Sequence, residues 1–250
     1  MSKHINFSSW KQLEPHWVDG LDERVSLIKH PFSNAIFVHP EFLPFPESSI
    51  TTLMSSTHHI TSLETLNLPA DKHDLVLFSP FLQWTQDVPG MLLQARRALK
   101  EGGFFVGCFF GQDTLIEFKS VCAELDLKYT QGLHQRFLPT IHAKDAGMLM
   151  QRAGFASPTS DIEHFCFSVP SVEYLVSNLR DSTLTNTKKN SHIPYLPTTR
   201  LPRNFMIEAN QSYVRQYPHS SGGINVTIDL IFMCGWKQAD LKAIANQTNS

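Results

Sequence analysis

The segment spanning residues 74–111 constrains the fold more than any other part of the chain. Asp74–Phe78 is a short apolar run that ends at Ser79-Pro80, long enough for a buried strand and too short for a helix. Apolar residues then recur at helical spacing, and Gly102-Gly103 signals the end of that helix. Phe104–Phe110 is a second apolar run of strand length. Two buried strands joined through one helix form a crossover unit, so the sequence predicts an α/β fold with a parallel sheet.

The same segment resembles the second half of the class I S-adenosylmethionine (SAM) methyltransferase fold. The matching pieces are a strand, an LQW motif, a glycine turn after a helix and the next strand: Asp74–Ser79, Leu82-Gln83-Trp84, Ala98–Gly103 and Phe104–Phe110. The resemblance implies a Rossmann-like α/β fold. It would have a seven-stranded, mostly parallel sheet with helices on both faces and a cap or lid insertion.

Beyond Gly111 the chain resembles more specifically the methyltransferase-like assembly factor 5 family of respiratory complex I (NADH dehydrogenase) and its bacterial relatives. The pieces that carry this resemblance are Gly111–Leu115 with Glu117, Asp145–Phe155, and Thr227–Asp229 with Gly235-Trp236. The resemblance covers roughly residues 14–237. It implies a role in complex I assembly, with a peripheral-arm subunit as the protein client. Members of that family are associated with hydroxylation of an arginine rather than with methylation.

The loop after the first expected strand departs from the methyltransferase pattern. Active members carry glycines there, because a residue without Cβ lets the backbone approach the cofactor closely. Here the expected strand Ala35–Val38 is followed by His39-Pro40-Glu41, and no glycine occurs between Gly20 and Gly90. The second strand, expected over Ile60–Ser62, also lacks the carboxylate that would bind the ribose hydroxyls. The SAM site therefore looks degraded, and we expect SAM binding to be weak or absent.

If a SAM site is retained, the resemblance places its contacts on His39, Glu41, Ser62, Glu64, Ser79, Gln83 and Trp84. Glu64, five residues before Pro69, matches the acidic position that usually meets the adenine. Trp84 has two interpretations, since it either faces a cofactor or packs under the next helix. No catalytic residue is identifiable. Three function classes stay open: a non-methylating assembly factor, a divergent SAM methyltransferase acting on a small molecule or protein, and a scaffold pseudoenzyme.

Two further sets of residues are candidates for contact with a substrate or client. Asp113, Thr114 and Glu117 follow the second strand of the crossover unit. They either face the crevice at the carboxyl edge of the sheet or, with Asp113 as the cap, complement the dipole of a helix predicted over Thr114–Leu127. The polar segment 181–204 is either a solvated loop or a lid that docks a partner. Its basic residues are Lys188, Lys189, Arg200 and Arg203.

The remaining elements follow from apolar spacing and from glycine and proline positions. Helices are predicted over Trp17–Lys29, Glu47–Ser56, Ala143–Ala153 (closed by Gly154), Val172–Leu179 and Arg203–Arg215, and strands over Ile162–Val169 and Ile224–Met233. We expect one methyltransferase-like domain, with residues 1–13 as an N-terminal extension and 238–250 as a C-terminal tail.

Composition excludes several function classes. A net charge of −2 gives no general attraction to nucleic acid, and no apolar run approaches the ~18 residues of a membrane span. The four cysteines lack CxxC spacing and the 12 histidines lack ligand spacing, so we expect core-filling cysteines, a reducing compartment and no metal site. The N-terminal sequence has no apolar signal core. A bacterial cytoplasmic protein is the simplest interpretation, and the mitochondrial matrix is the alternative for a eukaryotic protein.

Overall fold

The structure is a computed structural model, and it describes residues 3–6, 10–29, 31–41, 56–60, 64–134, 136–137, 139–181, 203–220 and 222–238. The strands are β1 (Lys3–Asn6), β2 (Ala35–Pro40), β3 (Ser56–Ile60), β4 (His73–Phe78), β5 (Leu99–Phe110), β6 (Ala156–Val169) and β7 (Ile224–Trp236). The α-helices are α1 (Glu14–Ser26), α2 (Val88–Ala98), α3 (Ile116–Thr130), α4 (Ala143–Arg152), α5 (Val172–Asp181) and α6 (Phe205–Gln216).

The chain forms two compact units. The first comprises Met1–Pro15, Phe110–Ile141 and Ile162–Leu230, and the second comprises His16–Phe109, His142–Asp161 and Ile231–Ser250. The long strands β6 and β7 contribute to both units, whereas β2 to β4 and α2 belong to the second alone.

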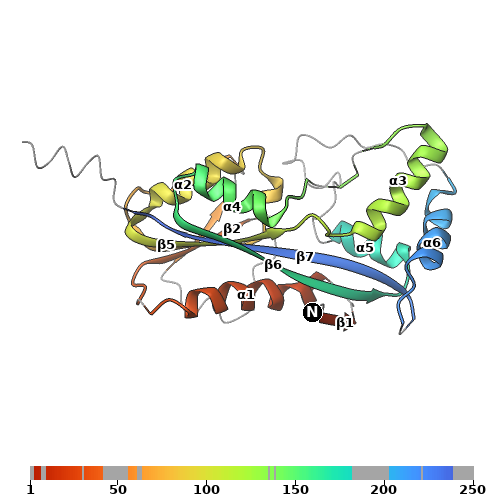
Figure 1. Ribbon diagram of the computed structural model, residues 1–250, viewed down its shortest axis with the longest axis horizontal. Coiled ribbons are helices and arrows are strands. Elements are labelled where there is room, and N and C mark those ends of the chain that lie inside the picture. The colour runs from red at the N-terminus through yellow and green to blue at the C-terminus, as the bar shows by residue number, and fades with distance from the viewer. Residues whose placement is uncertain are drawn as a thin grey trace, which may run out of the picture. The chain divides into compact units, whose positions relative to one another are not determined.

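The second unit contains the predicted crossover. Its strands are hydrogen-bonded in the order β6-β7-β5-β4-β2-β3, and β2 pairs in parallel with both β3 and β4, as β4 does with β5. Helix α2 connects β4 to β5. Helix α1 lies on one face of this sheet, while α2 and α4 lie on the other (Figure 1). The predicted Rossmann-like α/β class is thereby confirmed.

Strand β2 lies inside the sheet, as its apolar sequence predicts. All six of its residues are buried, and it is flanked by β3 and β4. The prediction for the neighbouring strand was wrong in position, because β3 ends at Ile60 instead of beginning there. The start of this strand was not predicted because it contains the polar residues His58 and His59. Whether such residues form a strand depends on tertiary pairing more than on their own preferences.

Most other predicted elements are present with shifted ends. Helix α4 is closed by Gly154, which has a φ of +82° and donates to Gln151 O at 3.0 Å, as predicted. Strand β5 begins at Leu99 rather than at Phe104, and the register with β4 shifts near this start. The predicted helix Glu47–Ser56 falls outside the described residues, except that its last residue begins β3.

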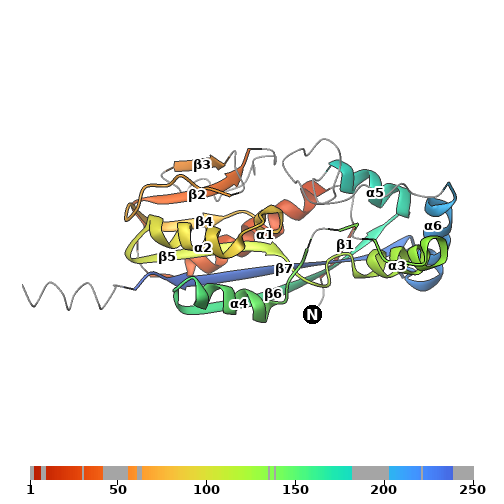
Figure 2. The ribbon, with the colours of Figure 1, turned by 90° about the horizontal axis from the view of Figure 1, so that it is seen from above.

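The first unit consists of β1, parts of β6 and β7, and three helices. Strand β1 pairs in parallel with β6, so the predicted N-terminal extension contributes a strand that its sequence did not reveal. Helices α3 and α6 lie side by side in two perpendicular views (Figures 1 and 2). Tyr129 Oη and Lys128 Nζ of α3 both donate to the Glu208 carboxylate of α6, each at 2.5 Å.

Candidate functional site

The candidate cofactor site is the carboxyl edge of the parallel strands β2, β3 and β4 in the second unit. Ligands of open α/β sheets bind at this edge, because the loops that follow parallel strands all leave from it. His39, Ser79 and Gln83 lie at the ends of β2 and β4. Ser62, which was predicted to follow the second strand, lies outside the described residues.

His39 belongs to the core next to α1. Its side chain is 1% exposed, and its ring stacks on that of Phe37 with centroids 5.6 Å apart. Phe37 in turn stacks on Trp17 of α1, at 6.2 Å. The three rings form a column on one face of β2, so His39 packs as a core residue.

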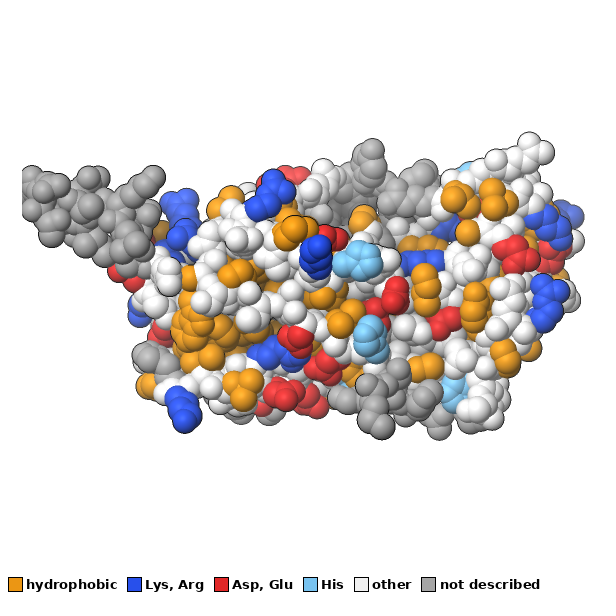
Figure 3. Space-filling model, in the orientation of Figure 1, with side chains coloured by type: hydrophobic (Ala, Val, Ile, Leu, Met, Phe, Trp, Pro, Cys, Tyr) orange, Lys and Arg blue, Asp and Glu red, His pale blue; other side chains and the backbone are white. Residues whose placement is uncertain are grey.

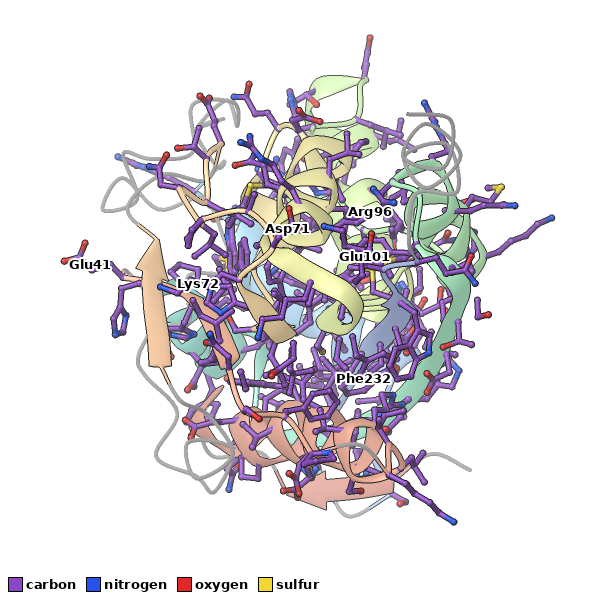
Figure 4. The ribbon with its side chains drawn as sticks, turned by 90° about the vertical axis from the view of Figure 1, so that its left-hand side faces the viewer. Glu41, Asp71, Lys72, Arg96, Glu101 and Phe232 are labelled. Carbon is purple, nitrogen blue, oxygen red and sulfur yellow. The ribbon has the colours of Figure 1, made fainter. Side chains whose placement is uncertain are left out.

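The two residues after His39 offer little to a cofactor. Pro40 is the last residue of β2, and its ring removes the backbone N–H that a cofactor carboxylate or hydroxyl would use. Glu41 is exposed and its carboxylate points away from the body of the protein (Figure 4). Among the described residues at this end of β2, Pro40 thus offers no backbone N–H and the carboxylate of Glu41 faces outward.

The end of β4 carries two buried polar atoms that lack hydrogen-bond partners among the described residues. They are Oγ of Ser79 and Oε1 of Gln83, while Nε2 of Gln83 donates to Pro80 O at 2.9 Å. An unsatisfied buried polar atom costs roughly 1–3 kcal/mol. These two atoms are consequently the ones at this edge that a bound polar ligand would satisfy.

Trp84 and Glu64 differ in the exposure of their side chains. Trp84 ends the 3₁₀ helix Leu82–Trp84 and is buried, which supports the interpretation that it packs under α2. Glu64 is exposed, and its main chain is tied to α2 by Gln94, whose Nε2 donates to Glu64 O at 3.0 Å. Gln94 Oε1 also accepts from Leu66 N at 2.8 Å. Nothing in the sequence pattern singled out this bridging glutamine.

In the first unit, Thr114 and Glu117 are buried and bind β7. Thr114 Oγ1 donates to Asp229 O at 3.1 Å, and Glu117 Oε2 accepts from Thr227 N at 3.0 Å. The two family-like segments around residues 111–117 and 227–229 are therefore joined by direct hydrogen bonds. Both side chains hold the start of α3 against the sheet.

The predicted cap of α3 was wrong. The N-cap residue is Leu115, in the left-handed conformation with a φ of 59°, and no side chain caps this end. The exposed Asp113 instead donates its backbone N–H to Oδ2 of Asp229, at 3.2 Å. A side-chain cap was expected because aspartate favours that position, but the buried acid on β7 fixes the turn.

Asp229 is the functional candidate that the sequence analysis missed. It is 1% exposed, and its Oδ1 lies 2.7 Å from Nδ1 of His164 on β6, whose side chain is 49% exposed. The available signal was the single charged residue inside a mostly apolar strand.

The remaining sequence predictions concern the basic segment 181–204, a metal site and a membrane span. Arg203 is exposed just before α6, while Lys188, Lys189 and Arg200 lie outside the described residues. Within the described ranges, no three His, Cys, Asp or Glu side chains are grouped to hold a metal ion, and no helix is long and apolar enough to cross a membrane.

Burial raises the pKa of Cys122 to about 12 and that of Cys234 to about 11, which makes both thiols poor nucleophiles.

Comparison with known proteins places this fold in a class. A family model described as a methyltransferase domain matches residues 40–107. The crystal structure of a candidate methyltransferase from Bacillus halodurans shares the fold, with a TM-score of 0.52 and 12% identity over 89% of this chain and 99% of that one. The chain therefore has a methyltransferase-like fold, and residues 40–107 match a methyltransferase domain.

In sequence, the chain is similar to the mitochondrial arginine-hydroxylase NDUFAF5. It is 30% identical to the Rattus norvegicus protein over 197 residues, which is 79% of this chain and 56% of the relative. It is 26% identical to the Danio rerio protein over 211 residues, 84% of this chain and 57% of the relative. The chain thus spans little more than half the length of these relatives.

Proposed function

We propose that this protein is a methyltransferase-fold assembly or modification factor that acts on a protein client and does not use SAM in the ordinary way. The client we infer is a peripheral-arm subunit of a complex I-type NADH dehydrogenase. Two lines of support are the similarity to proteins named arginine hydroxylases and the sequence segments shared with that assembly-factor family. We place it in the bacterial cytoplasm, or in the mitochondrial matrix if the source is eukaryotic.

The observation that carries this proposal is the end of β2. His39 is packed against Phe37, Pro40 has no N–H to donate, and Glu41 points outward. A cofactor that needs a glycine loop there would have to displace a buried ring. We therefore infer weak or absent SAM binding at this edge.

SAM is expected to change thermal stability very little. At 100 times the dissociation constant, a ligand stabilises the folded protein by about 2.7 kcal/mol, which thermal unfolding detects easily. We expect no resolvable rise in melting temperature with millimolar SAM or S-adenosylhomocysteine. A clear rise at micromolar SAM would contradict this, and its loss in Ser79→Ala and Gln83→Ala variants would locate the site at the end of β4.

A divergent SAM methyltransferase is the second candidate function. The unsatisfied atoms of Ser79 and Gln83 favour it, because they supply polar contacts at the edge where the superfamily binds its cofactor. The match of the methyltransferase-domain model to residues 40–107 also covers this edge. A scaffold without any catalysis is the third candidate. A negative SAM titration is expected for both the first and the third candidate. Mass spectrometry of the client distinguishes them, because only the first predicts a modified client.

Client capture is expected to depend on the basic segment 181–204. Acidic and basic side chains are interspersed on the face shown in Figure 3. The sequence of the segment itself has four basic residues and one acid, Asp181, so it would concentrate positive charge locally. Changing Lys188, Lys189, Arg200 and Arg203 together to Ser should reduce co-purification of peripheral-arm subunits severalfold, more at low salt than at moderate salt. The melting temperature should stay nearly constant, because exposed charges each contribute within about 0.5 kcal/mol.

A matched control removes the same number of charges elsewhere. Lys72, Lys100, Lys144 and Arg152 are all exposed on the second unit, and their joint change to Ser should leave capture intact. Equal losses from both quadruple variants would show that only total charge matters. Equal recovery from the wild type and the first variant would show that the segment is a surface connection.

A further inference from the structure

A buried carboxylate and a half-exposed imidazole meet on one face of β6 and β7 in the first unit. Asp229 Oδ1 lies 2.7 Å from His164 Nδ1, and Asp229 is 1% exposed against 49% for His164. The second oxygen of the carboxylate accepts the N–H of Asp113, at 3.2 Å. The main chain of Asp229 is also fixed, because its carbonyl accepts from Gly111 N at 2.9 Å and from Thr114 Oγ1 at 3.1 Å.

This geometry determines which nitrogen of His164 is available. A carboxylate only accepts hydrogen bonds, so Nδ1 carries the proton that is shared with Asp229. In the neutral ring, the lone pair then resides on Nε2, at the side of the ring away from the buried acid. An imidazole that is oriented through Nδ1 and open at Nε2 has the arrangement that general bases use.

The bond from Asp113 N to Oδ2 gives Asp229 a structural role in the turn before α3, which leaves the bond between Oδ1 and His164 to be explained. Removing a carboxylate from water costs several kcal/mol, and well-packed apolar residues would stabilise the two strands at least as well. Only one partner is buried here, so the pair lacks the fully enclosed geometry that makes a buried ion pair favourable. A buried acid that orients an exposed imidazole is instead the arrangement of acid–base dyads.

The surroundings of the pair are ionisable as well. Lys119 Nζ donates to Gln112 O at 3.1 Å and to Thr140 Oγ1 at 3.2 Å. Burial lowers the pKa of this lysine, and the nearby charges of Asp113 and Asp229 oppose that shift. The cluster therefore holds one cation close to two acids, one of which is the acid of the pair.

We propose that His164 and Asp229 form an acid–base dyad in which Nε2 of His164 accepts a proton from an O–H or N–H group of a bound client side chain or small molecule. The electron pair of the broken bond stays on the donor atom. The proton moves to Nε2, and Asp229 stabilises the resulting imidazolium without touching the substrate.

The base is tested with 5-nitrobenzisoxazole, a neutral probe whose elimination reports proton abstraction directly. A base removes the ring C–H proton, its electron pair completes a nitrile, and the N–O bond breaks to leave a coloured phenolate. The His164→Asn variant is expected to react roughly tenfold more slowly than the wild type, below the ~10²–10⁴-fold effect of a base in a closed site. His142→Asn, which removes another exposed histidine, should leave the rate unchanged.

Asp229 is tested as a positioning residue by Asp229→Asn together with imidazole ¹⁵N NMR. The wild-type spectrum should show Nε2 as the unprotonated nitrogen of His164, and the variant should show mixed tautomers and a rate as low as that of His164→Asn. Because Asp229→Asn also removes a buried charge, the wild-type spectrum provides a reading that does not depend on the variant folding. Equal rates in the wild type and His164→Asn, a proton found on Nε2, or full activity in folded Asp229→Asn would each overturn the dyad.

Discussion

Replacing Asp126 with alanine is expected to lower the free energy of unfolding by about 3–5 kcal/mol, the cost of breaking a buried ion pair from one side. Asp126 is 2% exposed on α3 and is paired with Arg136, which is 14% exposed. Both carboxylate oxygens accept from Arg136 Nε at 3.1 Å, and Oδ2 also accepts from His134 N at 3.2 Å. The guanidinium stacks on Phe205 of α6, 4.9 Å from the ring centroid, so it cannot leave without losing that contact.

Urea unfolding with linear extrapolation measures this loss. Lys128→Gln is the matched control. Lys128 lies on α3, like Asp126, and its pair with Glu208 of α6 is exposed, so breaking that pair should change stability little. Asp126→Leu combined with Arg136→Met should recover much of the lost stability, since it leaves no unpaired buried charge. A single-variant loss below about 1 kcal/mol would show that the pair is solvated in solution.

The crossover unit could be predicted from the sequence because its signals are local and mutually consistent. The apolar run of β4 and the helical spacing of α2 agree with the observed elements to within a few residues. Gly154 was equally readable, since a left-handed residue after a helix demands glycine. These features depend on backbone conformation and period, which a single sequence carries.

Elements that depend on distant partners could not be predicted in the same way. Strand β1 exists by pairing with β6, more than 150 residues later, and its four residues have no distinctive pattern. The turn before α3 was misread for the same reason, because its hydrogen bonds run to Thr227 and Asp229 on β7. Such contacts become visible only when strands remote in sequence are placed together.

The candidate sites show the same difference between local signals and signals from distant partners. The prediction of a degraded SAM loop after β2 rests on local residues, and the structure adds that His39 is buried in an aromatic column. The His164–Asp229 pair was missed, since its members are 65 residues apart and the family resemblance at Thr227–Asp229 did not point to His164. A single acid in an apolar strand nonetheless predicts a polar or charged partner, because a buried charge requires compensation.

Gly20→Ala is expected to lower the free energy of unfolding by about 1–3 kcal/mol, although alanine is favoured over glycine in a helix by ~1 kcal/mol. A Cβ at Gly20 would lie 2.6 Å from Cε1 of Phe232 and closer still to Cζ. The ring is fully buried and points toward α1 (Figure 4). It cannot shift freely, since the guanidinium of Arg24 lies 3.7 Å from its centroid.

The test is a double-mutant cycle between Gly20→Ala and Phe232→Leu, followed by urea unfolding. Phe232→Leu alone is destabilising because it removes buried ring atoms, but it also opens the space that a Cβ on α1 would need. The cost of Gly20→Ala should therefore disappear or change sign in the Phe232→Leu background. Gly132→Ala is the control, since its Cβ would meet no atom closer than 4.0 Å, and it should be neutral or slightly stabilising. Strictly additive losses in the cycle would mean that α1 and β7 do not approach as closely as the Gly20–Phe232 contact requires.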